Sequence, residues 1–170
     1  HNEQGEIVDI DCPVTIIGES KDGCIIIGGL RMLGNKEDDV NVKNLTISQS
    51  KGHGVSGECE GFPLMSFHLC NLNIEKSGRH GVCAYYTKRN TMSNCQVSHS
   101  KGCGVRVWSY PGTGFVTLMT MNGDGTSIHN NVTGTCTGGD IARDIGYGLS
   151  ASSSSSFIHL VSPLTKENIS

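Results

Sequence analysis

Several features are scarce in this 170-residue chain, and each scarcity excludes a class of protein. Aromatic residues make up only 5% of the chain, and no apolar run approaches the ~18 residues of a membrane-spanning helix. Lys and Arg (13 residues) do not outnumber Asp and Glu (16 residues), so the chain lacks the basic excess that sequence-independent nucleic-acid binding requires. We therefore expect neither a membrane span nor a nucleic-acid partner.

The eight cysteines also lack a recognisable pattern. No Cys-x-x-Cys pair occurs, and the spacings do not match those of a zinc site. We expect mostly free thiols, because a solenoid does not need disulfide staples. Cys95 stands where other repeats carry Leu45 and Leu72, which predicts a core residue that acts as a small hydrophobe.

A 14-residue segment occurs three times in the middle of the chain. It begins as VKNLTISQSKGHGV at 42–55 and returns in recognisable form at 69–82 and 92–105. The offset from the first copy to the second is 27 (69 − 42), and the offset from the second to the third is 23 (92 − 69). A period of this length is typical of a solenoid, in which each repeat buries its apolar face against the next repeat.

The pattern within the repeat indicates strands. Leu45 and Ile47 alternate with Thr46, which is the period of a strand with one buried face, and no window sustains the apolar series of an amphipathic helix. An asparagine occupies the same position in all three copies, as Asn44, Asn71 and Asn94. Stacked in register, these side chains are predicted to form an asparagine ladder.

The segment VNVKNLTI at 40–47 resembles the rungs of the right-handed parallel β-helix in the pectate-lyase-like superfamily. The resemblance implies an all-β fold and a single domain over 1–170, with regular coils over about 14–107 and irregular coils over 108–170. At roughly 23 residues per coil, the chain has room for about seven short coils. That fold carries lyases, hydrolases, epimerases and non-enzymatic fibres or adhesins, so it does not specify an activity.

Two coils are longer than the rest, and their extra residues point to one flank. The excess in the first falls between Gly57 and Ser66. After Val97, the next apolar anchor is predicted at Val132, well beyond one regular turn, with the extra residues around 109–118. Both excursions leave the coil after the Gly-Val strand, so stacking is expected to bring them to the same side.

That flank gathers the single Trp and three of the four Tyr. Tyr85 and Trp108 lie one full turn apart along the chain, which predicts two rings facing solvent about 5 Å apart as a flat platform. A sugar ring lies well against such a surface, and Lys88 or Arg89 would hold an acidic substituent. The predicted ligand-binding residues are Tyr85, Tyr86, Lys88, Arg89, Trp108 and Tyr110. The alternative is that these aromatics only pack the loops onto the coil.

Three residues are weaker candidates for catalysis. Gly52-His53-Gly54 resembles the Gly-His-Gly motif of polygalacturonases, whose histidine works beside paired carboxylates, but no Asp-Asp pair lies one turn before His53. The motif returns at His80, which marks it as part of the repeat. Arg106 would serve as the base of a lyase only beside a calcium-held uronate.

One acidic run is a candidate metal site. Glu37, Asp38 and Asp39 offer the clustered carboxylates that Ca²⁺ prefers. A solvated turn explains the same run, since it shows no regular ligand spacing. We expect no other cofactor.

Neither end of the chain shows an amphipathic capping helix. Open strand edges predict a partner or self-association through the solenoid ends. The chain begins at His1 and carries no signal peptide, so we expect a fragment of a longer chain.

These observations favour a non-enzymatic β-helix module, structural or glycan-binding, on an extracellular protein or on the surface of a cell or virion. A polysaccharide would be its partner. The first alternative is a polysaccharide-active enzyme, a uronate lyase or a glycoside hydrolase, with its cleft along the aromatic flank. The second is a repeat segment of a fibre that serves only to lengthen it.

Overall fold

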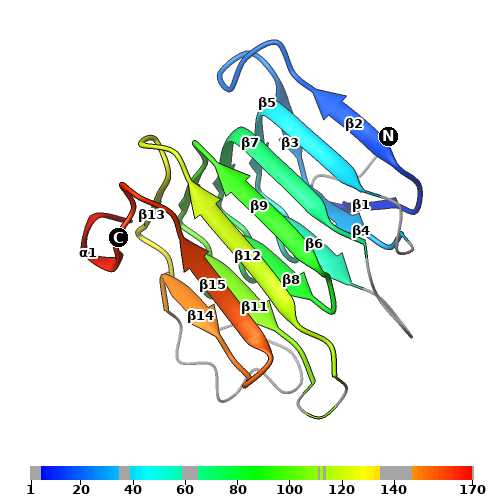
Figure 1. Ribbon diagram of the computed structural model, residues 1–170. Helices are drawn as coiled ribbons and strands as arrows, with labels where there is room; N and C mark the ends of the chain where they lie inside the picture. Colours follow the sequence, from blue (N-terminus) through cyan, green and yellow to red (C-terminus); the bar gives the residue numbers. More distant parts are fainter. Residues whose placement is uncertain are drawn as a thin grey trace.

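The computed structural model describes residues 5–34, 39–58, 65–110, 112, 114–134 and 147–169. Two sheets of parallel strands face each other in a stack of coils, with the two termini toward opposite ends (Figure 1). Among the described residues, every strand pairing is parallel, and the only helix is the four-residue α1 (Lys166–Ile169). The predicted fold class, an all-β parallel β-helix, is confirmed.

The six-stranded sheet carries one short strand from each coil, in the order β1-β4-β6-β8-β11-β14. These strands are β1 (Ile7–Ile10), β4 (Gly29–Met32), β6 (Val55–Glu58), β8 (Val82–Tyr85), β11 (Val105–Trp108) and β14 (Leu149–Ala151).

The nine-stranded sheet forms the opposite wall, in which β5 and β7 are the longest strands, with nine residues each. Its strands are β2 (Val14–Ile17), β3 (Ile25–Ile27), β5 (Val40–Ser48), β7 (Phe67–Glu75), β9 (Arg89–Ser93), β10 (Gln96–Ser98), β12 (Thr117–Asn122), β13 (Ser127–His129) and β15 (Ser156–Leu160).

The register of the strands follows the two repeat offsets. In the nine-stranded sheet Leu45 lies opposite Leu72, which is the offset from the first copy of the repeat to the second. In the six-stranded sheet Val82 lies opposite Val105, which is the offset from the second copy to the third. Equivalent positions of the sequence repeat are therefore neighbours in space.

The core lies between the two sheets and is filled by the alternating apolar residues of the repeat. Leu72, Ile74 and Cys95 are fully buried, which confirms the predicted core position of the cysteine. Because each such side chain stacks on its counterpart in the next coil, burial by the neighbouring coil supplies the stability that a single repeat lacks.

A column of glycines brings the two sheets together at one corner. The backbone N–H of Val55 donates to the carbonyl oxygen of Gly81, and that of Val82 donates to Gly104 in the same way. A Cβ at Gly81 would lie 2.2 Å from Cγ1 of Val97 in the opposite sheet. The glycine of the repeated Gly-Val pair is therefore required because a side chain at this corner would collide with the opposite sheet.

The predicted asparagine positions form a second corner. Asn44, Asn71 and Asn94 all adopt left-handed backbone angles, with φ of 55°, 56° and 51°. The Asn71 amide Nδ2 donates to Oδ1 of Asn44 at 3.0 Å. Asn94 Oδ1 instead accepts from the backbone N–H of Gly125 at 3.3 Å. One amide–amide bond is thus present, and the ladder through Asn94 stays a prediction.

Two numerical predictions differ from the structure. The solenoid has about four regular turns, not seven, because the excursions and the C-terminal part use residues without adding regular coils. The anchor predicted at Val132 is also wrong. Ile128 pairs with Val97 and is buried, whereas Val132 is 42% exposed. The offset from Val97 to Ile128 exceeds the regular one by eight (31 − 23). The strand register shows that six of these residues are added between β11 and β12 and two between β12 and β13.

The two ends of the stack differ. At the C-terminal end Leu164 and Ile169 of the α1 region join the hydrophobic core, a small cover that was not predicted. At the N-terminal end Ile17 and Ile25 on the first coil are more than half exposed. Self-association through the ends stays a prediction. No helix in the described part of the chain has the length and apolar character of a membrane span.

Candidate functional site

A pocket of about 340 Å³ opens on the outer face of the six-stranded sheet. It is lined by residues of β6, β8 and β11, of the turns before β6 and β8, and of the segment that follows β11. The lining consists of His53, Glu58, Arg79, His80, Cys83, Tyr85, Arg106, Trp108 and Tyr110.

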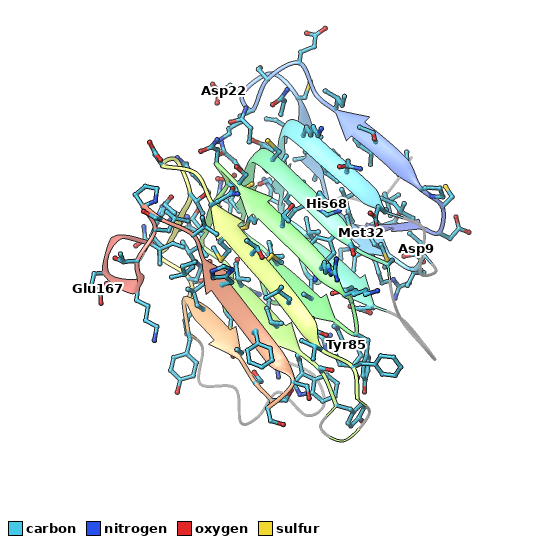
Figure 2. All side chains as sticks on the ribbon, viewed as in Figure 1. Asp9, Asp22, Met32, His68, Tyr85 and Glu167 are labelled. Carbon is cyan, nitrogen blue, oxygen red and sulfur yellow. The ribbon has the colours of Figure 1, made fainter. Side chains whose placement is uncertain are left out.

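Strand alternation places the outer lining residues. On β11, Val105 and Val107 are fully buried in the core, so Arg106 and Trp108 point outward and are partly exposed. On β8 the same alternation turns Tyr85 outward at the end of the strand (Figure 2). The predicted solvent-facing position of the two rings is therefore present.

The rings of Tyr85 and Trp108 stack face to face. The two residues are direct partners in the sheet, their ring centroids are 4.5 Å apart, and their planes differ by 5°. At this separation parallel rings must overlap, so they do not lie side by side as the predicted platform requires. Both rings line the pocket.

Two further tyrosines complete an aromatic cluster. Tyr110 packs against Trp108 with centroids 4.5 Å apart, and Tyr86 packs against Tyr85 at 4.4 Å, both in edge-to-face geometry. Burial, and then the neighbouring Tyr86, raise the pKa of the Tyr85 phenol above its ordinary value. Tyr85 is therefore a neutral hydrogen-bonding group at physiological pH.

Two histidines stack in the same way at the inner wall of the pocket. The rings of His53 and His80 are 5.1 Å apart with an interplanar angle of 13°. Nδ1 of His53 accepts the backbone N–H of His80 at 3.3 Å, and Nδ1 of His80 accepts the backbone N–H of Cys103 at 2.9 Å. Because Nδ1 of His53 is an acceptor and its Nε2 faces the Glu58 carboxylate, the hydrogen-bond network assigns the ring hydrogen of His53 to Nε2.

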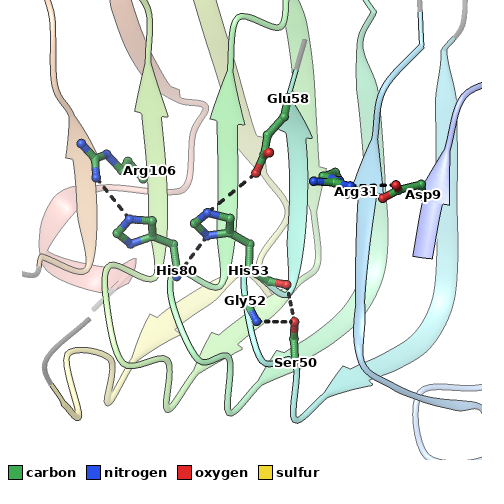
Figure 3. A network of polar contacts seen from close by, with 8 residues as sticks. All are labelled: Asp9, Arg31, Ser50, Gly52, His53, Glu58, His80 and Arg106. Atoms are coloured by element: carbon green, nitrogen blue, oxygen red, sulfur yellow. Dashed lines mark hydrogen bonds and ion pairs between the residues drawn. The ribbon is translucent and has the colours of Figure 1, made fainter. Parts of the chain in front are cut away.

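The two Nε2 atoms meet charged side chains (Figure 3). Glu58 Oε1 lies 3.9 Å from Nε2 of His53. On the other side, Nη1 of Arg106 lies 3.2 Å from Nε2 of His80. Glu58, the two imidazole rings and Arg106 thus form a continuous line of polar contacts that crosses three coils.

The field in the pocket favours uncharged imidazole. Burial, followed by the charges of His80, Arg79 and Arg106, lowers the pKa of His53 from 6.5 to about 3. Burial likewise raises the pKa of the Cys83 thiol to about 12. At neutral pH His53 is therefore a neutral donor, and Cys83 is a protonated thiol.

The pocket unites residues that the sequence had placed in separate groups. The three weak catalytic candidates (His53, His80 and Arg106) and three of the six predicted ligand-binding residues (Tyr85, Trp108 and Tyr110) all line it. Tyr86 is buried against the aromatic cluster. Lys88 and Arg89 lie just before and at the start of β9, in the opposite sheet, and are not among the lining residues.

Cys83 lines the pocket although no sequence pattern had singled it out. The repeat offset carries the signal, because Cys83 pairs with Arg106 in the sheet and must therefore point outward with it. Its small side chain leaves room beside the long arginine.

The candidate metal site is only partly described. Asp39 Oδ2 lies 3.6 Å from Nε2 of His68, on the nine-stranded sheet (Figure 2), while Glu37 and Asp38 fall outside the described residues. Within the described ranges, no group of three or more His, Cys, Asp or Glu side chains is arranged to hold a metal ion.

No family model, curated protein or solved structure matches this chain. The functional argument therefore rests on the chemistry of the pocket.

Proposed function

We propose that this chain is a non-enzymatic β-helix module, of the pectate-lyase-like kind, that binds a glycan in the pocket beside Tyr85 and Trp108. The observation that carries the proposal is the aromatic stack at the rim of a cavity lined by hydrogen-bonding groups. Binding sites for small ligands combine apolar walls with a few polar groups in this way.

Each wall offers a different contact to a sugar. The aromatic cluster supplies flat apolar surface for the C–H groups of a pyranose ring. The Glu58 carboxylate accepts hydrogen bonds from hydroxyl groups, and the Nε2–H group of His53 donates them. The cavity of about 340 Å³ falls at the small end of the range for ligand sites, which fits one or two sugar units better than a long buried segment.

The same geometry supports binding over catalysis. Glycoside hydrolysis uses two carboxyl groups, and Glu58 is the one carboxylate among the described lining residues. His53 cannot take a proton at Nε2, which already carries hydrogen, and its Nδ1 accepts a backbone bond. Its lowered pKa, about 3, also makes it a poor base at neutral pH.

A glycan array with the wild type and Trp108→Ala tests this proposal. We expect the wild type to bind a defined set of glycans and Trp108→Ala to lose them. Phe157→Ala is the matched control, because Phe157 is an exposed aromatic on β15 of the opposite sheet. Unchanged binding by Trp108→Ala would overturn the proposal. Unsaturated products from uronate polymers incubated with Ca²⁺ would instead establish the lyase alternative.

An extracellular or cell-surface location is part of the same proposal, since a glycan-binding module would meet polysaccharides there. Detection of the intact protein on unpermeabilised cells with an antibody, and its loss after protease treatment of those cells, would support this location. Signal that appears only after permeabilisation would contradict it.

A further inference from the structure

We infer that the N-terminal end of the solenoid is an interface between two copies of this chain, joined first coil to first coil about a two-fold axis. The first coil consists of β1, β2 and β3, which are the outermost strands of the two sheets at this end (Figure 1). The interface does not involve the pocket, which is built on β6, β8 and β11, so it is independent of the proposed glycan binding.

The hydrophobic core is open at this end. Val8 on β1 faces inward, because its partner in the next coil is Leu30, which is 3% exposed, yet Val8 itself is 45% exposed. In the other sheet Ile26 pairs with the fully buried Ile47 and is itself only partly buried. Inward-facing side chains that a neighbouring coil covers elsewhere in the stack are thus uncovered here. This end therefore resembles one half of a buried interface.

A collar of isoleucines surrounds the open core. Ile16 and Ile26 pack against the core, so strand alternation turns Ile17 and Ile25 to the outer face of the nine-stranded sheet, where they are 64% and 56% exposed. Of the ten exposed large hydrophobic residues in the described part of the chain, five belong to the first coil, namely Ile7, Val8, Ile17, Ile25 and Ile27. Apolar surface gathered in this way marks an interaction site.

The strand edges at this end are free to pair. Within the described residues, β1 pairs only with β4, and β2 and β3 pair only with β5. Natural edge strands discourage association by charged side chains or prolines. These three strands contain one charged residue, Asp9, and Arg31 pairs with it through hydrogen bonds of 2.7 and 2.8 Å. Such an edge is expected where another strand edge covers it.

The opposite end of the stack favours a two-fold arrangement over head-to-tail stacking. There α1 lies against β13, and Ile169 of α1, together with Leu164, belongs to the hydrophobic core. A copy stacked head to tail would meet α1 before it reached the edge of β13. A two-fold axis instead brings the two open ends together, so that both copies bury the same isoleucines. With the axis along the normal of the sheets, the β1 strands of the two copies run antiparallel, which is a favourable pairing.

The area of this end matches what a stable dimer needs. β2 and β3 lie along the nine-residue strand β5, so the coil is about 30 Å long, and two facing sheets with their outer side chains are about 20 Å across. The end therefore offers ~600 Å² per copy, or ~1,200 Å² in total, which is the lower limit for specific, stable interfaces.

Sedimentation velocity of the 170-residue chain over a range of concentrations tests the interface. We expect a reversible monomer–dimer equilibrium. Ile25→Lys should weaken the dimer at least about tenfold, because each copy would bury an unpaired charge. Phe157→Lys is the matched control and should leave the dimer unchanged, since Phe157 is 50% exposed on β15, at the C-terminal end of the stack.

Thermal melting of the dilute variants shows whether each is folded, and the outward position of Ile25 predicts a folded monomer. A wild-type chain that stays monomeric at its highest soluble concentration would overturn the interface. So would a dimer that a folded Ile25→Lys variant leaves intact, or one that Phe157→Lys disrupts.

Hydrogen exchange with mass spectrometry locates the contact without any substitution. At concentrations where the dimer forms, the amides of β1, β2 and β3 should exchange at least about tenfold more slowly than in the dilute monomer, whereas those of β14 and β15 should not change. Protection of β14 and β15 as well, with species larger than a dimer, would show head-to-tail stacking and overturn the two-fold interface.

Discussion

The backbone N–H of His80 donates to Nδ1 of His53 one coil away, and the two imidazole rings stack 5.1 Å apart. The same bond is repeated from Cys103 to His80. Each histidine therefore substitutes for a backbone acceptor at a corner of the solenoid. For His53 this hydrogen bond also fixes the tautomer, so its Nε2–H is the group that a ligand in the pocket meets.

The lowered pKa of His53 predicts a loss of stability in mild acid. The unfolded chain takes up the proton near pH 6.5, whereas folded His53 takes it up only near pH 3. The unfolded state therefore binds more protons as the pH falls below 6.5, and folding is weakened. We expect the free energy of unfolding to drop by about 1–2 kcal/mol between pH 7 and pH 5 through this group.

Chemical denaturation of the wild type and His53→Gln at pH 7 and pH 5 measures that effect. A glutamine oxygen can accept the His80 N–H without titrating, so the variant should show the smaller drop. The pH range avoids Asp9 and Glu75, whose pKa values are lowered and whose contributions are lost only in stronger acid. Parallel changes in the two proteins would show that His53 titrates normally in the fold.

Asn71 is predicted to matter for two separable reasons, its amide bond and its left-handed backbone. Asn71→Gly removes only the bond to Asn44 and should cost about 1 kcal/mol. Asn71→Ala also loses the local polar contacts through which an asparagine tolerates the left-handed region, φ 56°, and should cost about 2–3 kcal/mol. Equal unfolding free energies for the two variants would contradict the strain. Wild-type stability in both would contradict the ladder.

Gly81 should be among the least replaceable residues of the repeat. A Cβ there would lie 2.2 Å from Val97 Cγ1 and 2.7 Å from the carbonyl oxygen of Gly104. We expect Gly81→Ala to lower the unfolding free energy by about 3 kcal/mol or to prevent folding. Gly125→Ala is the control, because its nearest contact would be an ordinary 3.5 Å. A Gly81→Ala protein as stable as Gly125→Ala would mean that the sheets can separate freely at this corner.

Thiol reactivity should separate the buried pocket cysteine from an exposed one. Cys83 is buried with its pKa raised to about 12, whereas Cys12 is exposed. At pH 8 iodoacetamide should modify Cys12 quickly and Cys83 only after denaturation, since the thiolate is the reactive form. Peptide mass spectrometry over time gives both rates. Rapid modification of Cys83 in the native protein would show that the pocket wall opens.

The solenoid was predictable because the residues that pair between neighbouring coils recur in the sequence at regular offsets. The Gly-Val pairs recur at the same offsets as the asparagines, and only Gly fits where Gly81 approaches Val97. Such a steric requirement keeps the glycine recognisable in each copy of the repeat even where the neighbouring positions differ. The predicted number of coils was wrong because the excursion at 109–116 carries no repeat pattern. Its residues were nevertheless counted as parts of regular coils when the chain length was divided by the repeat length.

The site was predictable only in part. The offset between Tyr85 and Trp108 gave their pairing and outward direction but not the overlap of the rings, which depends on side-chain torsions. The convergence of His80 with Arg106 was also out of reach. Their separation along the chain is more than one period, and they meet because Arg106 reaches back across the sheet.

The stacked strands also make this surface adjustable one coil at a time. Ser56, Cys83 and Arg106 occupy one outward column with neighbours roughly 5 Å apart, while Val82 and Ala84 beside them face the core. A charge or a ring introduced at Ser150, the partly exposed partner of Arg106 on β14, would therefore stand about 5 Å from Arg106 without entering the core between the sheets. Because the spacing between neighbouring strands is constant, the distance between two substituted side chains in this column is known beforehand. Substitutions can therefore adapt the surface to ligands whose charges are differently spaced.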